Sequence, residues 1–106
     1  MTKKPFKPGA KNSPYIIKVW DIAMEHITQT DADKLGLSRF PGCVIPYDEG
    51  VTIIVSDDED QAAAMQDYGM SEAFLRIWEL AREHEVHEIR IDADGTQYSD
   101  LEVFEW

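Results

Sequence analysis

One stretch decides the fold of this chain: SEAFLRIWELAREHEVHEIRIDAD, residues 71–94. In its first half, apolar residues such as Phe74 and Trp78 recur at helical spacing, and Ser71 precedes them as a favourable N-cap. In its second half the period changes to two, so that Ile89 and Ile91 fall on one side of a strand. A helix with an aromatic stripe that leads into a half-buried strand needs a sheet to pack on. The stretch therefore predicts a folded α+β domain.

Toward the N-terminus, the sequence predicts a strand followed by a short helix. Residues 15–22 (YIIKVWDI) have large apolar side chains at both alternating sets of positions, which favours a strand in the interior of the sheet. The helix is expected over residues 29–36, because Thr28 and Asp31 have capping-box spacing. Gly36 is expected to end this helix in the left-handed conformation.

The centre of the chain predicts a β-hairpin and then another helix. Two β-rich runs, residues 43–47 and 51–56, flank a short loop that ends in glycine. Pro46 lacks an N–H donor, which places the first of these strands at the edge of the sheet. Residues 58–67 predict a short helix that ends at Gly69, with a loop as the alternative.

The resulting order is strand, helix, strand, strand, helix, strand, followed by a C-terminal extension. This order predicts an α+β fold: a two-layer sandwich, ferredoxin-like or similar, with other two-layer arrangements that contain a meander as alternatives. The extension ends on Phe104 and Trp106, and we expect it to dock on the body of the protein. We expect residues 1–13 to be a disordered basic tail and residues 14–106 to be a single α+β domain.

The chain is strongly acidic, with 21 acids, ten bases and a net charge of −11. Four of the bases are lysines within residues 1–13, so the remaining residues carry 21 acids against six bases. Such a field repels nucleic acid and anionic membranes, and it attracts basic protein surfaces. We therefore expect the partner to be a basic protein surface, such as that of a nucleic-acid-binding protein, with no direct binding to nucleic acid or membrane. A surface that only keeps the chain soluble is the other interpretation.

Cysteine content and hydropathy predict a cytoplasmic protein. Cys43 is the single cysteine, which excludes an intrachain disulfide and fits a reducing compartment. No apolar run approaches the ~18 residues of a membrane span, and the sequence shows no signal-peptide pattern.

Catalytic, cofactor-binding and phosphate-binding motifs are absent from the sequence, so we expect no enzyme activity, no cofactor and no bound metal. Asp92-x-Asp94-Gly95 resembles part of a calcium loop, but the positions of the remaining ligands do not match, which favours a plain turn. The alternative hypothesis is a small metal-assisted enzyme that uses Asp92, Asp94 and a histidine.

The three histidines give this alternative little support. His84 and His87 lie on either side of the predicted break between helix and strand, with no cysteine nearby, which disfavours zinc binding. His26 lies at the junction between a strand and a helix, where a hydrogen-bonded structural histidine is the favoured interpretation.

The highest charge density lies in four consecutive acids after the hairpin. Ser56 and Glu59 have capping-box spacing, which places these acids at the start of a helix, beside a hairpin turn that also carries acids. Binding residues concentrate on loops of this kind. The predicted partner-binding residues are Asp48, Glu49, Asp57, Asp58, Glu59 and Asp60.

Four blocks of the sequence resemble a small family of unknown function whose members are encoded on plasmids, prophages and integrative elements. The blocks are Glu25-His-Ile-Thr28, Pro46-Tyr-Asp-Glu-Gly50, Ile89-Arg-Ile-Asp-x-Asp-Gly95 and Leu101-x-Val-Phe-Glu-Trp106, within residues 15–106. The family usually has proline after the leucine of the last block, where this chain has Glu102. The resemblance implies a mobile genetic element as the setting and no known chemistry.

Together, the charge and the resemblance predict an acidic protein-binding module of a mobile genetic element. The finer form of this prediction is an inhibitor of a host defence or DNA-binding protein. Such an inhibitor would imitate nucleic acid by displaying carboxylates to a surface that binds phosphates.

Overall fold

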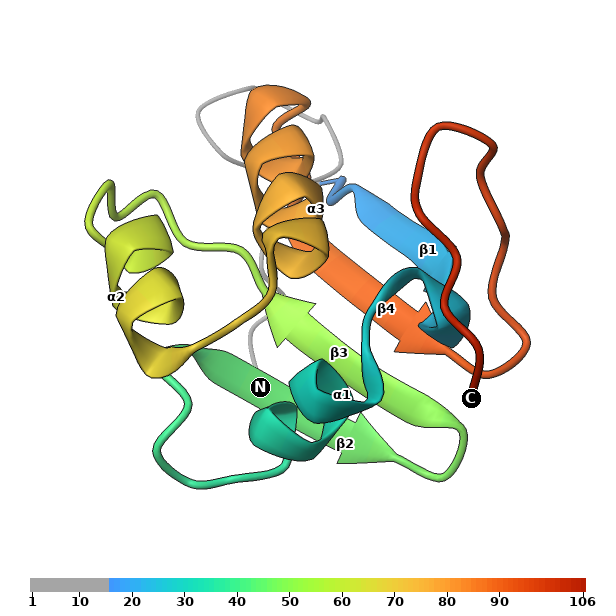
Figure 1. Ribbon diagram of the computed structural model, residues 1–106. Helices are drawn as coiled ribbons and strands as arrows, with labels where there is room; N and C mark the ends of the chain where they lie inside the picture. The colour runs from blue at the N-terminus through green and yellow to red at the C-terminus, as the bar shows by residue number, and fades with distance from the viewer. Residues whose placement is uncertain (1–15) are drawn as a thin grey trace, which may run out of the picture.

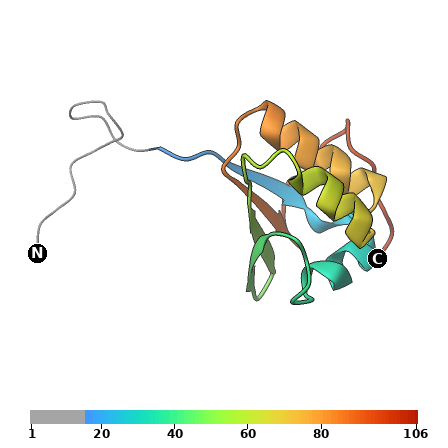
Figure 2. The same ribbon diagram turned by 90° about the vertical axis from the view of Figure 1, so that its left-hand side faces the viewer.

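A computed structural model describes residues 16–106, which form one four-stranded sheet with helices on one of its faces (Figures 1 and 2). The elements in chain order are β1 (Val19–Ala23), the 3-10 helix η1 (Met24–His26), α1 (Gln29–Leu35), β2 (Cys43–Tyr47), β3 (Gly50–Ile54), α2 (Gln61–Tyr68), α3 (Glu72–Glu83) and β4 (Glu88–Asp92). The predicted order of helices and strands is confirmed, and the predicted helix after the hairpin exists as α2. The basic tail predicted for residues 1–13 lies outside the described residues, as does the first residue of the predicted strand 15–22.

The strands lie in the order β1-β4-β3-β2, with β1 parallel to β4 and the other two pairs antiparallel. The predicted two-layer α+β sandwich is confirmed. Its sheet differs from the antiparallel sheet of the ferredoxin-like fold, because β1 and β4 are parallel. β2 is an edge strand, as Pro46 predicted. β1 is the other edge strand, so the prediction that it lies inside the sheet is wrong.

The exposure of β1 explains why its apolar residues gave this misleading signal. Among residues 16–106, no helix covers the second face of the sheet (Figure 2). Val19 lies on that face and is 40% exposed, while Ile22, on the face covered by the helices, is fully buried. Apolar residues at both alternating positions therefore reflect an uncovered face here, and not burial on two sides.

The core lies between α3 and the two central strands. Ile53 of β3 and both isoleucines of β4 are completely buried beneath the apolar stripe of α3. The predicted stripe is confirmed, and its buried members are Phe74, Ile77, Trp78 and Ala81. The predicted alternation in β4 is confirmed as well, because Ile89 and Ile91 are buried while Arg90 between them is exposed.

One buried carboxylate supports the N-terminal caps of two helices. The predicted capping box of α1 is confirmed: the Asp31 N–H donates to Thr28 Oγ1 at 3.0 Å, and the Thr28 N–H donates to Asp31 Oδ2 at 3.1 Å. The same carboxylate accepts the Ser71 N–H at 2.9 Å and the Ser71 hydroxyl at 2.5 Å. Ser71 in turn caps α3 by accepting the Phe74 N–H at 3.1 Å, as predicted. Asp31 therefore joins the N-termini of α1 and α3.

Two predicted details of helix ends are wrong. Gly36 ends α1 with φ −80°, in the right-handed region, because the chain continues into a further turn in which the Leu37 N–H bonds to Lys34 O. The expected capping box of Ser56 with Glu59 does not form. The Ser56 hydroxyl instead accepts the Asp58 N–H within a tight turn, and α2 begins after Asp60 without a side-chain cap. Gly69 ends α2 in the left-handed conformation with φ 100°, as predicted.

The C-terminal segment runs alongside β1 and η1 (Figure 1). Main-chain bonds hold it: the Ala23 N–H donates to Thr96 O at 2.9 Å, and the Phe104 N–H donates to Glu25 O at 2.7 Å. Phe104 is partly buried, but Trp106 is 49% exposed. The expected docking is therefore confirmed for Phe104 and wrong for Trp106. Main-chain hydrogen bonds attach the segment, so its last aromatic residue does not need to pack on the body of the protein.

Candidate functional site

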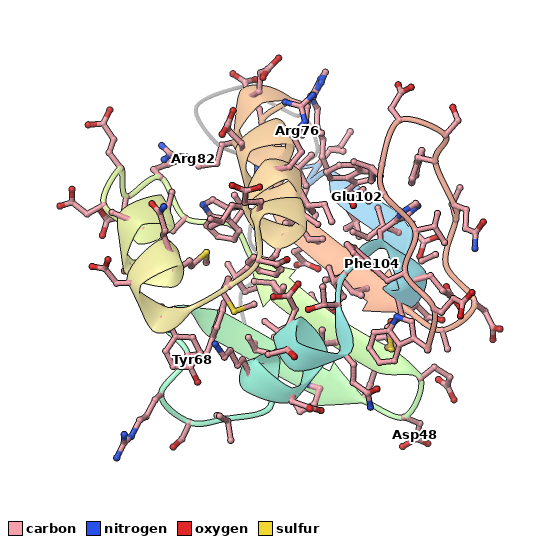
Figure 3. The ribbon with its side chains drawn as sticks, viewed as in Figure 1. Asp48, Tyr68, Arg76, Arg82, Glu102 and Phe104 are labelled. Atoms are coloured by element: carbon pink, nitrogen blue, oxygen red, sulfur yellow. The ribbon has the colours of Figure 1, made fainter. Side chains whose placement is uncertain are left out.

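The six predicted partner-binding acids lie in two separate groups at opposite ends of β3. Asp48 and Glu49 form the β2–β3 turn, whereas the run 57–60 connects β3 to α2, and all six side chains are exposed. A five-residue strand spans about 13 Å between its first and last Cα atoms, so one group is not beside the other. Figure 3 shows Asp48 and Arg82, which neighbours the second group, on opposite sides of the molecule. The expectation of a single acidic face is therefore corrected to two acidic ends.

The connection between β3 and α2 is held in place mainly through its main-chain carbonyls. Most of its carboxylate oxygens are therefore free to bind a partner. The Arg82 guanidinium donates to the carbonyls of Asp57 at 3.2 Å and Asp58 at 3.4 Å. One carboxylate oxygen of Asp58 accepts the Asp60 N–H at 2.9 Å. Within residues 16–106, no hydrogen bond reaches the carboxylates of Asp57 and Glu59. Asp57 and Glu59 can therefore meet a cationic partner without first breaking an internal contact.

The β2–β3 turn is fixed to the end of β4. The Tyr47 hydroxyl donates to Asp92 Oδ2 at 2.7 Å, and the Ala93 N–H donates to Glu49 O at 2.9 Å. Gly50 packs so closely against the Ile91 carbonyl that a Cβ atom would collide with it, which explains the glycine at this position. The turn is therefore a rigid support for Asp48 and Glu49.

The contact between Tyr47 and Asp92 shifts the pKa values of both groups. Partial burial, followed by the hydrogen bond to Asp92 and its charge, raises the pKa of Tyr47 to about 12. The hydrogen bonds from Tyr47 and from the Asp94 N–H lower the pKa of Asp92. Asp92 is therefore an anion whose two oxygens are already bonded, with Oδ1 accepting the Asp94 N–H at 2.7 Å.

An apolar groove of about 500 Å³ lies between the β2–β3 turn and α1. Its floor contains the buried residues Ile27, Leu35 and Ile91, while Asp48 and Glu49 lie at its border. Sequence reasoning missed this groove, because its residues come from η1, α1, the hairpin and the end of β4. Apolar periodicity identified the buried residues but could not show that a recess remains open above them.

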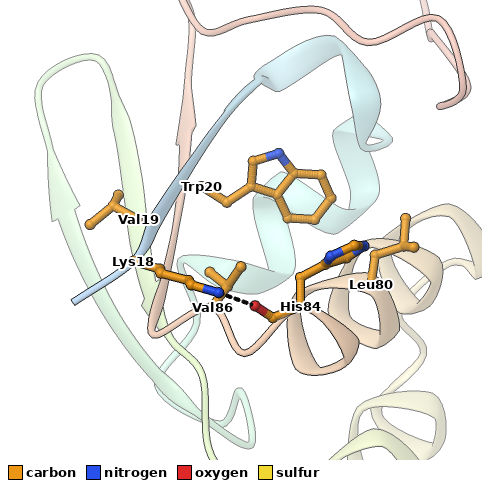
Figure 4. A pocket seen from close by; sticks show the side chains of 6 residues that line it. All are labelled: Lys18, Val19, Trp20, Leu80, His84 and Val86. Carbon is orange, nitrogen blue, oxygen red and sulfur yellow. Dashed lines mark hydrogen bonds between the residues drawn. The ribbon is translucent and has the colours of Figure 1, made fainter. Parts of the chain in front are cut away.

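A second pocket of about 490 Å³ lies between β1 and α3 (Figure 4). Trp20, Leu80 and Val86 give it apolar walls, and Lys18 crosses its border to donate from Nζ to the His84 carbonyl at 3.0 Å. None of the six predicted acids lines this pocket. It therefore does not extend either acidic group.

The basic residues of the body do little to neutralise the acids. Lys18 and Arg82 donate to main-chain carbonyls, and Lys34 Nζ does the same toward Tyr68 at 3.3 Å and Gly69 at 3.0 Å. Within residues 16–106, no lysine or arginine donates a hydrogen bond to a carboxylate. Sixteen of the 21 acids are exposed, so most of the negative charge faces solvent uncompensated.

The rings of two of the three histidines, His26 and His87, have structural partners. His26 is completely buried; its Nδ1 lies 2.6 Å from the Glu102 carbonyl, and its Nε2 accepts the Tyr98 N–H at 2.8 Å. Because Nε2 accepts, Nδ1 is the ring nitrogen that donates to the Glu102 carbonyl. The hydrogen-bonded corner histidine is thus confirmed. His87 Nδ1 accepts the Lys18 N–H at 3.0 Å.

The part of the chain that the structure describes contains no group of three His, Cys, Asp or Glu side chains placed to share a metal ion. Asp92 and Asp94 form the predicted turn instead, closed by the Gly95 N–H to Asp92 O bond at 3.0 Å. The metal-assisted enzyme therefore remains a hypothesis with no assembled ligand set in residues 16–106.

We expect the melting temperature to be unchanged by a chelator and by added zinc, magnesium or calcium. An ion that binds only the folded state must raise stability, by about 2.7 kcal/mol at a hundredfold excess over its dissociation constant. The measurement is a thermal melt followed by circular dichroism with each ion. A reproducible rise that is absent from Asp94→Asn would contradict this expectation and support the enzyme hypothesis.

No helix in residues 16–106 combines the length and apolarity needed to cross a bilayer.

Comparison with known protein families gives a match over most of the chain. A family described as "Family of unknown function (DUF5983) C-terminal domain" matches residues 19–106, which includes every helix and strand described above. No curated protein and no solved structure matches the chain.

Proposed function

Because this chain belongs to the DUF5983 family of unknown function, we propose a function from its surface: an acidic protein-binding module of a mobile genetic element. The observation that carries the proposal is the uncompensated charge. The 21 acids face six bases in the body, and three of those bases donate to main-chain carbonyls. The partner is a protein with a basic surface, which such a field attracts over long range.

The finer proposal is that the module inhibits a host defence or DNA-binding protein by imitating nucleic acid. Its support is the distribution of the acids over both ends of the sheet, since a long basic surface built for a duplex can contact both ends at once. A protein that binds phosphates by charge alone accepts carboxylates in their place.

Neutralising the acidic connection is expected to slow partner binding and flatten its salt dependence. The variant replaces Asp57, Asp58 and Asp60 by Asn and Glu59 by Gln, leaving the main-chain contacts of Arg82 intact. Exposed charges contribute little to stability, so its melting temperature should stay within a few degrees of the parent. The measurement is the association rate as a function of ionic strength, with a partner first captured from the native host at low salt.

A matched control removes the same charge elsewhere. It replaces four exposed helix acids, Asp33 and Asp67 by Asn and Glu79 and Glu83 by Gln. A smaller effect in this control would assign binding to the connection, and an equal effect would assign it to net charge alone. Identical salt slopes for the parent and both variants would reject the proposed function. Duplex DNA should displace the captured partner, and failure to compete would reject the nucleic-acid imitation.

A further inference from the structure

The groove at the hairpin end combines an apolar floor with an acidic border. Ile27 and Leu35 are 1% and 3% exposed, and Ile91 is fully buried, so the floor is an extension of the core. Met24 and Ala93 complete the apolar walls, and Ala93 itself is exposed. A recess of this kind accepts one aliphatic side chain, because insertion removes the apolar surfaces of both the groove and the side chain from water.

The charges around this groove have one sign. Asp48 and Glu49 line it directly, Asp92 and Asp94 lie on either side of Ala93, and no lysine or arginine is among its lining residues. The pocket between β1 and α3 differs in this respect, because it is lined by Lys18 and by no acid. The hairpin groove therefore combines an apolar recess with a border of negative charge, which attracts cations.

The acidic border is also held in place before any partner arrives. The Tyr47–Asp92 bond of 2.7 Å and the Ala93–Glu49 bond of 2.9 Å attach the turn to β4 at two points. Gly50 allows the turn to approach the Ile91 carbonyl directly. A preorganised site loses little conformational entropy on binding, which favours a short linear ligand.

We propose that this groove binds a segment of a partner protein in which an aliphatic side chain is flanked by lysines or arginines. The aliphatic side chain enters the groove above Ile91, and its basic neighbours meet Asp48 and Glu49. The proposal rests on the proposed function and names the contact that the basic partner makes. Charge complementarity excludes a nucleic acid as the occupant, and it disfavours a second copy of a chain whose net charge is −11.

Three synthetic peptides test the groove directly: acetyl-Lys-Lys-Leu-Lys-Lys-amide, the same peptide with serine in place of leucine, and the same peptide with glutamates in place of all lysines. Binding is followed by the amide NMR signals of Glu49, Val51 and Ala93. The leucine peptide should bind about tenfold more tightly than the serine peptide, since burial of a leucine side chain accounts for at least that ratio. The glutamate peptide should not bind.

A variant that fills the groove separates apolar insertion from charge attraction. Ala93→Trp places a large ring in the recess without changing charge, and Ala63→Trp on the exposed side of α2 is its control. We expect Ala93→Trp to weaken the leucine peptide about tenfold and the serine peptide little, with no effect of Ala63→Trp. Asp48→Asn combined with Glu49→Gln should weaken both lysine peptides, whereas Asp33→Asn combined with Glu79→Gln should not.

Failure of this inference is distinguishable from failure of the proposed function. One outcome would overturn the groove as a binding site: the leucine and serine peptides bind with equal affinity, and Ala93→Trp changes neither affinity. The proposed function would still stand if capture of the partner remained dependent on salt. If instead the captured partner shows the same salt slope with every acidic variant, the proposed function fails even though the leucine peptide still occupies the groove.

Discussion

Replacing Trp78 by alanine should lower the free energy of unfolding by about 3–5 kcal/mol, which is enough to unfold many domains of this size. Trp78 is 1% exposed on the face of α3 that packs on the sheet. Its indole N–H has no hydrogen-bond partner within residues 16–106, so truncation removes packing without breaking a polar contact. The whole effect should therefore come from lost apolar burial and from the cavity that remains.

Urea denaturation followed by circular dichroism measures this effect. Trp106→Ala is the matched control, because its side chain is 49% exposed and its loss should change stability by less than about 1 kcal/mol. Trp78→Phe should be intermediate, since it keeps most of the ring and removes an unpaired buried donor. A midpoint for Trp78→Ala equal to that of the parent would mean that α3 does not pack on the sheet by this face.

Replacing Asp31 by alanine should destabilise the fold by about 3 kcal/mol or more. The loss of a helix cap costs about 1–2 kcal/mol, and this carboxylate supports the start of two helices. Its removal also leaves the Thr28 N–H and the Ser71 N–H without their acceptor at a site where Asp31 is 1% exposed. Asp31→Asn should lose less, because its amide keeps one oxygen as an acceptor.

Asp33→Ala is the control for this prediction, since Asp33 lies on the same helix with an exposed side chain. Its effect should stay within about 0.5 kcal/mol. Hydrogen exchange adds a second measurement, because Asp31→Ala should expose the first amides of both α1 and α3. Equal stabilities of the two variants, or exchange that changes in α1 alone, would contradict the shared cap.

The elements that could be predicted from sequence are those whose signals are local. The stripe of Phe74 and Trp78, the alternation of Ile89 and Ile91, and the Ser71 cap depend on neighbours a few residues apart. Each of these signals has one dominant physical cause: the burial of apolar side chains, or the need of an N–H group at a helix start for an acceptor. The structure shows these side chains buried and this N–H group bonded.

The features that could not be predicted depend on contacts between distant segments. Asp31 and Ser71 were each expected to cap one helix, but no local pattern reveals that the two caps touch across 40 residues of chain. Val19 gave an interior signal because composition cannot tell a covered face from a bare one. The expectation that the predicted acids form one face was wrong for the same reason: Asp48 and the run 57–60 are close in sequence, yet a strand places them at opposite ends.

Within residues 16–106, the pairing of β1 with β4 joins the first strand to the last. Val19 pairs with Glu88, so β1 finds no neighbour in the sheet until β4 has left the ribosome. Closing so long a loop is slow compared with forming the β2–β3 hairpin, and the nascent chain meanwhile exposes Ile16 and Trp20. Completion of the sheet should therefore wait until β4 has been synthesised and has emerged, and β1 is the segment that a chaperone would protect until then.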